Sequence, residues 1–154
     1  MSFTQKPDLN ILQGSLLAKG NANTYSPNSG IYAFPLTVGK TWEAKANFAT
    51  STGRTGSYKL DAKVVGWEKV KVPAGEFDTL KITESGFYQS ANEAGTRTGT
   101  GRMQITIWYA PAVGGMVKTQ YEDTNWGGSL YNKYTLELLG YSLSDKRSEG
   151  SGAN

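Results

Sequence analysis

The chain has 154 residues, which fits one domain large enough to bury a substantial core, and it contains neither cysteine nor histidine. These two absences exclude disulfides, thiolate metal sites and cysteine nucleophiles, and they remove the usual general base and every Ser-His-Asp arrangement. The net charge of +3 comes from scattered basic residues, with no run longer than Lys146-Arg147, so the clustered charge on which nucleic-acid binding depends is missing.

The composition predicts a sheet protein. Aromatic side chains pack on pleated surfaces and glycine supplies the reversals between strands, so 19 glycines and 12% aromatic residues favour β structure. No stretch approaches the roughly 20 apolar residues of a membrane-spanning helix. Residues 1–7 contain no apolar signal core, and we expect a soluble chain, or a mature segment from which a signal peptide has been removed.

The first forty residues carry weak strand signals. The stretch up to Gly30 is rich in Asn, Ser and Gly, and within it only residues 11–17 are expected to form an edge strand. Residues 31–36 are short and apolar, but Pro35 has no N–H donor. We therefore expect this piece to be a strand at a sheet edge, or the end of one.

Alternation with period two begins at Thr41 and predicts two paired strands. Successive side chains of a strand point to opposite faces, so each strand has one apolar face. These apolar positions are Trp42, Ala44, Ala46 and Phe48, then, after a hairpin connection at residues 50–56, Tyr58, Leu60, Ala62 and Val64. The alternation breaks at Val65-Gly66, which predicts a β-bulge or bend. Trp42 and Trp67 are both predicted to lie in the core.

The rest of the chain reads as further hairpins. Val72-Pro73-Ala74-Gly75 predicts a tight turn, because proline and glycine suit its first and last positions. The expected elements that follow are a strand at 77–88, a polar mobile loop at 90–101, a strand around Met103, Ile105, Ile107 and Tyr109, turns at 111–115 and 125–128, and a last strand at 131–141.

Consecutive strands joined by short turns predict an all-β fold with no substantial helix. About eight to ten strands should form a single antiparallel meander curled into a barrel or half-barrel, with a β-sandwich as the alternative. Curling is favoured because of the bend at Gly66. The domain is expected to span residues 1–143 with its core at about 31–141, followed by a disordered tail at 144–154.

No catalytic, metal or cofactor site is predicted. Without histidine, two carboxylates could still support glycoside hydrolysis, and the candidate pairs are Glu76 with Asp78 and Glu122 with Asp123. The first pair follows a tight turn where solvated acids are ordinary, and the second should point to opposite faces. Glu84 lies on an otherwise apolar strand face, and we expect it to be paired or at the rim of the core.

Exposed aromatic residues are the remaining functional signal. Trp108 lies on the strand face opposite Ile105 and Ile107, and Trp126 lies at a turn. An exposed tryptophan can hold a sugar ring, a lipid or a partner, so the ligand-binding candidates are Trp108, Tyr109, Trp126 and Tyr131. The alternative is that each tryptophan caps one end of the core.

Three segments together carry a family resemblance. They are Phe34-Pro35-Leu36-x-x-Gly39-Lys40-x-Trp42, Gly66-Trp67-Glu68-x-Val70-x-Val72-Pro73-Ala74-Gly75-x-Phe77-x-x-Leu80-Lys81, and Trp108-Tyr109-Ala110-Pro111-x-Val113-Gly114-Gly115-x-Val117-Lys118. In this order they resemble an uncharacterised, TapB-like family of bacterial envelope domains, with a more remote similarity to the LolA and LolB lipoprotein carriers. The resemblance covers roughly residues 31–141, and the middle segment is the specific one.

The resemblance implies a curved antiparallel sheet, export to the periplasm or outer membrane of a Gram-negative bacterium, and no established activity. It transfers no catalytic residue. The leading hypothesis is therefore a non-enzymatic envelope domain that binds a lipid, another apolar ligand or an envelope protein through its concave sheet, without nucleic acid and without a membrane span. The alternatives are a carbohydrate- or peptidoglycan-binding module that uses exposed aromatics, and a surface antigen or structural subunit.

Overall fold

A computed structural model describes residues 4–5, 11–14 and 23–142, and within these ranges all regular secondary structure is β. The nine strands are β1 (Thr4–Gln5), β2 (Ile11–Gly14), β3 (Asn23–Ser26), β4 (Thr41–Thr50), β5 (Thr55–Val72), β6 (Gly75–Ala91), β7 (Arg97–Ala110), β8 (Gly115–Asn125) and β9 (Leu130–Glu137). No helix in the described ranges is long and apolar enough to cross a membrane.

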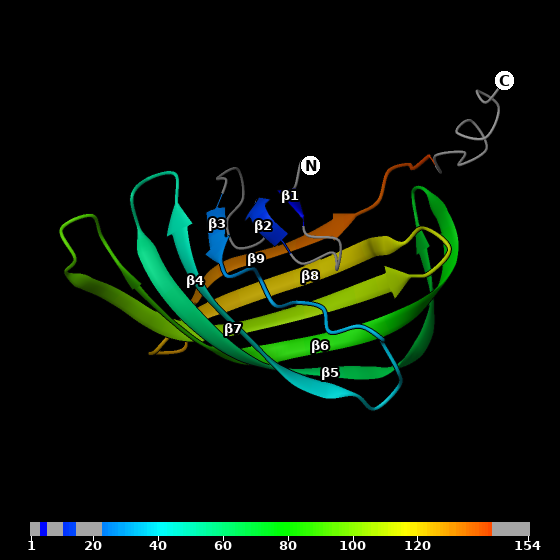
Figure 1. Ribbon diagram of the computed structural model, residues 1–154, viewed down its shortest axis with the longest axis horizontal. Helices are drawn as coiled ribbons and strands as arrows, with labels where there is room; N and C mark the ends of the chain where they lie inside the picture. Colours follow the sequence, from blue (N-terminus) through cyan, green and yellow to red (C-terminus); the bar gives the residue numbers. More distant parts are fainter. Residues whose placement is uncertain (1–3, 6–10, 15–22, 143–154) are drawn as a thin grey trace, which may run out of the picture.

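The strands form one antiparallel sheet in sequential order, from β1 to β9, as the short connections predicted. Figure 1 shows this sheet bent into a deep trough, with β1–β3 at its open side. The outermost strands β1 and β9 do not pair with each other, so the sheet is an open half-barrel. Neither a closed barrel nor the second sheet of a sandwich is formed by the described residues.

Two features allow the sheet to bend so strongly. The register of β5 against β6 shifts between Val64 and Gly66, which confirms the predicted bulge. Gly86 and Gly101 also leave space for backbone on the concave face. A Cβ at Gly86 would collide with the carbonyl oxygen of Lys59, and one at Gly101 with a carbonyl oxygen of β8. Side chains at these two positions would therefore force the strands apart.

The bulge moves the apolar side chains of β5 from one face of the sheet to the other. Before it, Tyr58, Leu60 and Val64 belong to the main core on the concave face. After it, Val70 and Val72 contribute to a second cluster on the opposite face, and the other buried members of that cluster are Phe77, Trp108, Ala110 and Val117. The backbone of Leu138 closes this second cluster, because its N–H donates to Val117 (2.8 Å) and its carbonyl accepts from Ala74 (3.0 Å).

The structure corrects one core prediction. Trp67 pairs with Leu80 on the face of the main core, but it lies beyond the end of that core and is 61% exposed. Its predicted burial is therefore wrong. Trp42 is half-buried against the main core, and its indole N–H donates to the carbonyl of Gly30 at 3.0 Å.

The predicted strand at 31–36 is also wrong. Residues 27–40, here called the strap, form no strand and run along the trough from β3 to β4 (Figure 1), with Ile31 and Tyr32 buried in the main core. The strap is held by Tyr58, whose hydroxyl donates to the carbonyl of Ser29, and by Lys40, whose Nζ donates to the carbonyl of Ala33 at 2.7 Å. Because Ile31 and Tyr32 gain core contacts there, burial outweighs sheet pairing for this segment.

Three other boundaries differ from prediction. The polar stretch 90–101 is mostly strand, because β6 and β7 stay paired as far as Ala91 and Arg97 and leave only residues 92–96 as a connection. The last strand ends at Glu137, four residues before the predicted end at 141. Residues 11–14 form a strand that lies between β1 and β3, so it is not an edge strand. The predicted tail at 144–154 lies outside the described residues.

Candidate functional site

A small hollow, here called the inner pocket, lies on the concave face near the hairpin that joins β4 to β5. Its volume is about 250 Å³. The apolar part of its wall comes from the side chains of Phe48, Tyr88, Met103 and Tyr121, which four different strands place on the same face. All four side chains also contact the main core, so the pocket wall continues the concave face of that core.

The floor of the inner pocket contains a fixed carboxylate, Asp123. Its Oδ2 accepts hydrogen bonds from the hydroxyl of Tyr121 at 2.7 Å and from the amide of Asn132 at 3.2 Å, and its Oδ1 accepts from the Asn132 backbone N–H at 3.0 Å. Burial and the neighbouring Asp123 charge raise the pKa of Tyr121 far above its ordinary value, so this phenol stays a donor at neutral pH. Asp123 is therefore held by three donors inside the protein.

Asn23 also lines this pocket and carries an unsatisfied polar atom. This residue is 1% exposed, and its Oδ1 has no hydrogen-bond partner among the described residues. Its Nδ2 lies 3.5 Å from the hydroxyl of Tyr25. A buried amide oxygen without a donor costs free energy, and a ligand carrying an N–H or O–H group could provide the missing bond.

The mouth of the inner pocket is more polar. Arg54 and Tyr131 both line it, and Tyr131 is 67% exposed. The pKa of Tyr88 is raised by burial and by the charge of Asp123, and the nearby Arg54 opposes this shift. Tyr88 is thus a neutral phenol at physiological pH.

The four aromatic residues predicted as a ligand site do not come together. Tyr131 lines the inner pocket, whereas Tyr109 lies elsewhere on the concave face, with its ring 5.8 Å from that of Tyr32 in the strap. Trp126 is 73% exposed at the β8–β9 turn and packs on Phe87. The four residues therefore belong to separate parts of the sheet.

Trp108 lies on the face opposite the main core, as its position in the alternation predicted, but it is only 6% exposed. The Nζ atoms of Lys81 and Lys118 lie 5.5 and 5.2 Å from its ring. Both lysines pair with Trp108 in the sheet register, so they cover the indole from the two neighbouring strands. Trp108 is therefore part of the second cluster and offers no open platform.

Glu84 lies in the centre of the main core, between Ala62 and Ile105 in the sheet register. It is 1% exposed, and neither carboxyl oxygen has a hydrogen-bond partner among the described residues. The expectation of a paired or rim carboxylate is wrong. Desolvation raises the pKa of Glu84 well above its ordinary value, and the strap residue Tyr32 is among the groups on which its charge acts.

The predicted acid pairs have ordinary surroundings. Glu76 and Asp78 are exposed, with oxygens 3.7 and 3.9 Å from Nζ of Lys69. Glu122 pairs with Lys133 at 3.4 Å on the surface, whereas Asp123 is buried in the inner pocket, so these two acids do point to opposite faces. Within the described ranges, no group of three or more acidic side chains is placed to hold a metal ion.

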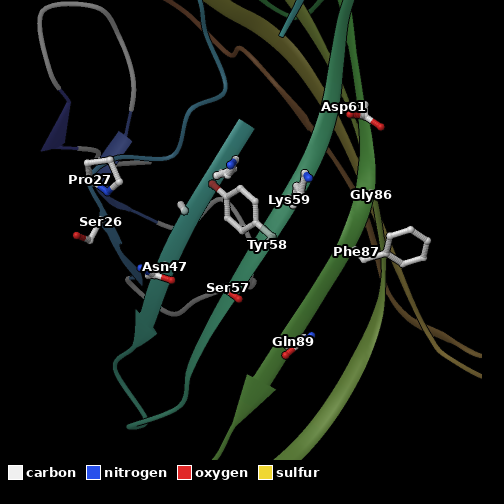
Figure 2. Close-up of a pocket in the computed structure, with 12 residues that line it drawn as sticks. Ser26, Pro27, Asn47, Ser57, Tyr58, Lys59, Asp61, Gly86, Phe87 and Gln89 are labelled. Atoms are coloured by element: carbon white, nitrogen blue, oxygen red, sulfur yellow. The ribbon is translucent and has the colours of Figure 1, made fainter. Parts of the chain in front are cut away.

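A second hollow, here called the outer groove, is wide and open and has a volume of about 640 Å³. Figure 2 shows Asn47, Ser57 and Gln89 in a row across β4, β5 and β6, with Phe87 projecting from β6 nearby. The sheet register places all four side chains on the face opposite the main core. The outer groove and the inner pocket are thus on different faces of the sheet.

Sequence patterns locate some of these site residues and miss others. The alternation identifies Tyr88, Met103 and Tyr121 as inward-facing, but it does not show that they surround a hollow. Asn23 gave no signal, because it lies in a polar stretch with no clear period. Its place in the pocket depends on the pairing of β3 with β4, which brings it opposite Thr50.

The fold and the inner pocket define a class of protein: an all-β domain built as an open, strongly curved meander with a small aromatic-lined pocket in its hollow. The DUF3108-like family model matches residues 43–136, from β4 to β9, which is more than half of the chain, and the protein belongs to this family of unknown function. The match begins after the strap. Neither the curated proteins nor the solved structures include a match to the chain.

Proposed function

We propose that the protein is a non-enzymatic binding domain whose inner pocket takes the apolar end of a small ligand that also carries a hydrogen-bond donor. The observation that supports this most directly is the unpartnered, buried Oδ1 of Asn23 in an aromatic-lined pocket. A donor placed there would remove a desolvation penalty of about 1–3 kcal/mol. The aromatic wall would contribute through burial of apolar surface.

The size of the inner pocket limits what it can hold. Sites for drug-sized molecules usually measure about 300–1,000 Å³, and this pocket is about 250 Å³. It therefore suits one ring, the end of an acyl chain or a single side chain of a peptide. A longer lipid or lipopeptide would bind with one end inserted and the remainder outside, near Arg54 and Tyr131 at the mouth.

The internal bonding of the pocket supports binding over catalysis. Asp123 is already engaged by three donors, and an acid that acts as a base needs a free oxygen near the substrate. The phenols of Tyr88 and Tyr121 have raised pKa values and remain protonated. Asp123, Tyr88 and Tyr121 are therefore suited to hydrogen bonding with a ligand in a fixed geometry.

The setting that we propose is the bacterial envelope, in the periplasm or at the outer membrane, where the bound partner would be a lipid, a lipopeptide or an envelope protein. The support for this is the resemblance of the three sequence segments to TapB-like envelope domains and, more remotely, to lipoprotein carriers. Fractionation of the source cells with an antibody against the chain tests the setting. Recovery in the cytoplasm alone would contradict it.

Native mass spectrometry and organic extraction of the purified protein test the binding function, followed by titration with fatty acids and lipopeptides. We expect a bound or titratable ligand, and weaker binding by Asn23→Leu, which removes the amide oxygen at similar volume. Gln104→Leu makes a similar change on the outer face of β7, at an exposed residue that lines neither hollow, and is the matched control. Absence of ligand by extraction, with no binding of either probe class, would contradict the proposal, as would equal binding by the two variants.

A further inference from the structure

The outer face of the sheet carries a pair of exposed aromatic rings. Phe87 is 51% exposed and Trp126 is 73% exposed, and their ring centroids are 5.8 Å apart with the planes inclined at 49°. Phe87 belongs to β6 and Trp126 to the turn after β8, so the sheet fold is needed to bring them together. We call this pair the aromatic platform.

The aromatic platform is held in place before any ligand arrives. The guanidinium of Arg102, which pairs with Phe87 in the sheet register, lies 5.6 Å from the Phe87 ring. The backbone N–H of Trp126 donates to the carbonyl of Thr100 at 3.2 Å and ties the turn to β7. A platform that is already ordered loses little conformational entropy on binding.

A row of hydrogen-bonding side chains extends from the platform along the outer groove. Asn47, Ser57 and Gln89 are exposed, are paired in register across three strands, and make no side-chain hydrogen bond with other described residues (Figure 2). Neighbouring strands are about 4.8 Å apart, so the row presents donors and acceptors at intervals close to the length of one sugar ring. A surface that offers ring faces beside evenly spaced polar groups matches a carbohydrate, which has C–H faces and hydroxyl edges.

The charges of the outer groove select against a polyanion. Lys45, Lys59 and Asp61 line it, Glu43 borders it and Arg102 lies beside the platform, so the site carries a net charge of no more than +1. Glu43 binds Nζ of Lys45 at 2.8 Å and Nζ of Lys59 at 3.0 Å. Nucleic acids bind chiefly by phosphate neutralisation, and here both lysines are already neutralised.

We propose that the aromatic platform and the outer groove form a binding site for a neutral glycan chain. One sugar ring stacks on Trp126 and Phe87, and the following rings cross β6, β5 and β4 along the polar row. This site lies on the opposite face from the inner pocket and does not depend on a ligand there.

Titration with two neutral probes, cellotetraose and chitotetraose, tests this site by isothermal calorimetry and tryptophan fluorescence. We expect at least one probe to bind, and Trp126→Ala to weaken that binding by about tenfold or more, because loss of about 1.4 kcal/mol of stacking corresponds to that factor. Trp67→Ala is the matched control, since Trp67 is a similarly exposed tryptophan far from the groove. The control should bind like the wild type.

Several outcomes would overturn the proposal. Absence of binding by both probes would do so, as would equal affinity of Trp126→Ala and wild type. Preferential binding of heparin or single-stranded DNA, with steep salt dependence, would show a polyanion site. Sedimentation velocity tests whether a second copy of the chain covers the platform. A wild-type dimer that Trp126→Ala converts to a monomer would identify the platform as an interface between two copies.

Discussion

The buried carboxyl of Glu84 leads to a prediction about stability. Glu84 is 1% exposed in the main core, and both of its oxygens lack hydrogen-bond partners among the described residues. Methionine has a similar shape and no group that requires a partner. Glu84→Met should therefore stabilise the protein, although it replaces a residue at the centre of the fold.

The magnitude follows from the desolvation of an unsatisfied polar group. That cost is about 1–3 kcal/mol, so the free energy of unfolding should rise by a similar amount in Glu84→Met. For a chain of this size each kcal/mol moves the melting temperature by about 2–4 °C. This gain in stability should be present at neutral pH. An uncharged Glu84 there lacks hydrogen-bond partners among the described residues, and an ionised Glu84 carries the additional cost of a buried charge.

The pH dependence has a definite sign. The pKa of Glu84 in the folded protein lies well above the ordinary value of 4.5, so the folded state binds more protons than the unfolded state between the two pKa values. This contribution to stability is complete below the unfolded pKa. It is lost as the pH rises through the folded pKa, with a slope of up to about 1.4 kcal/mol per pH unit.

Urea unfolding at a series of pH values, from acidic to mildly alkaline, measures both effects. Glu84→Gln stays polar but cannot ionise, so its stability should fall less steeply with rising pH than that of the wild type. Glu76→Gln makes the same change at an exposed position and should leave the wild-type pH profile nearly unchanged. Parallel profiles for Glu84→Gln and wild type, or a less stable Glu84→Met, would show that Glu84 is not a desolvated carboxyl without partners.

Three further experiments test the arrangement of the sheet. Trp108→Ala should lower the free energy of unfolding by about 3–5 kcal/mol and Trp67→Ala by at most about 0.5 kcal/mol, because only Trp108 is buried. Equal losses in urea unfolding would contradict this difference in burial. Gly86→Ala should lower the free energy of unfolding by about 1–3 kcal/mol, because its Cβ collides with a facing carbonyl oxygen. Gly66→Ala is the control, because a Cβ there meets nothing within 4 Å. Equal melting temperatures of the two variants would contradict the close approach of the backbone at Gly86. Tyr58→Phe should lower the free energy of unfolding by about 1–3 kcal/mol, because it removes the hydroxyl that donates to the strap carbonyl of Ser29. An unchanged melting temperature would contradict a stabilising role for this hydrogen bond.

The two proposed sites use the two faces of one sheet in different ways. The concave face has a small pocket with buried, fixed polar groups, which suits the end of an apolar ligand. The opposite face has an open groove with exposed polar side chains and an aromatic platform. A curved sheet separates these surfaces because successive side chains of every strand point to opposite sides.

Part of the candidate sites was predictable. Trp126 and Tyr131 were singled out as aromatic residues at or beside a turn, and both are exposed. Their role in ligand binding stays a prediction. Trp108 was correctly placed on the outer face, and of the two alternatives left open, an exposed platform or packing at the core, the structure shows packing, with Lys81 and Lys118 covering it from the two strands beside it. Phe87 gave no signal on its own, since only Trp126 makes it part of a platform.

The strands from β4 onward, the order in which they pair and the bend follow from local sequence patterns. Period-two alternation marks the strands that begin at Thr41, the turn at residues 73–74 lies where Pro and Gly predicted it, and Gly66 marks the bulge. These features are local, since a residue's backbone preferences and its nearest neighbours decide them. Short connections then make consecutive strands pair in order.

The contents of the trough and the positions of its hollows depend on contacts between distant parts of the chain. The strap enters the concave face because Ile31 and Tyr32 find core contacts there, and nothing within residues 27–40 reveals this. The inner pocket brings together Asn23 and Asp123 from opposite ends of the domain. Burial depends on how the whole sheet curves, and residues far apart in the chain set that curvature together, so it cannot be read from one strand at a time.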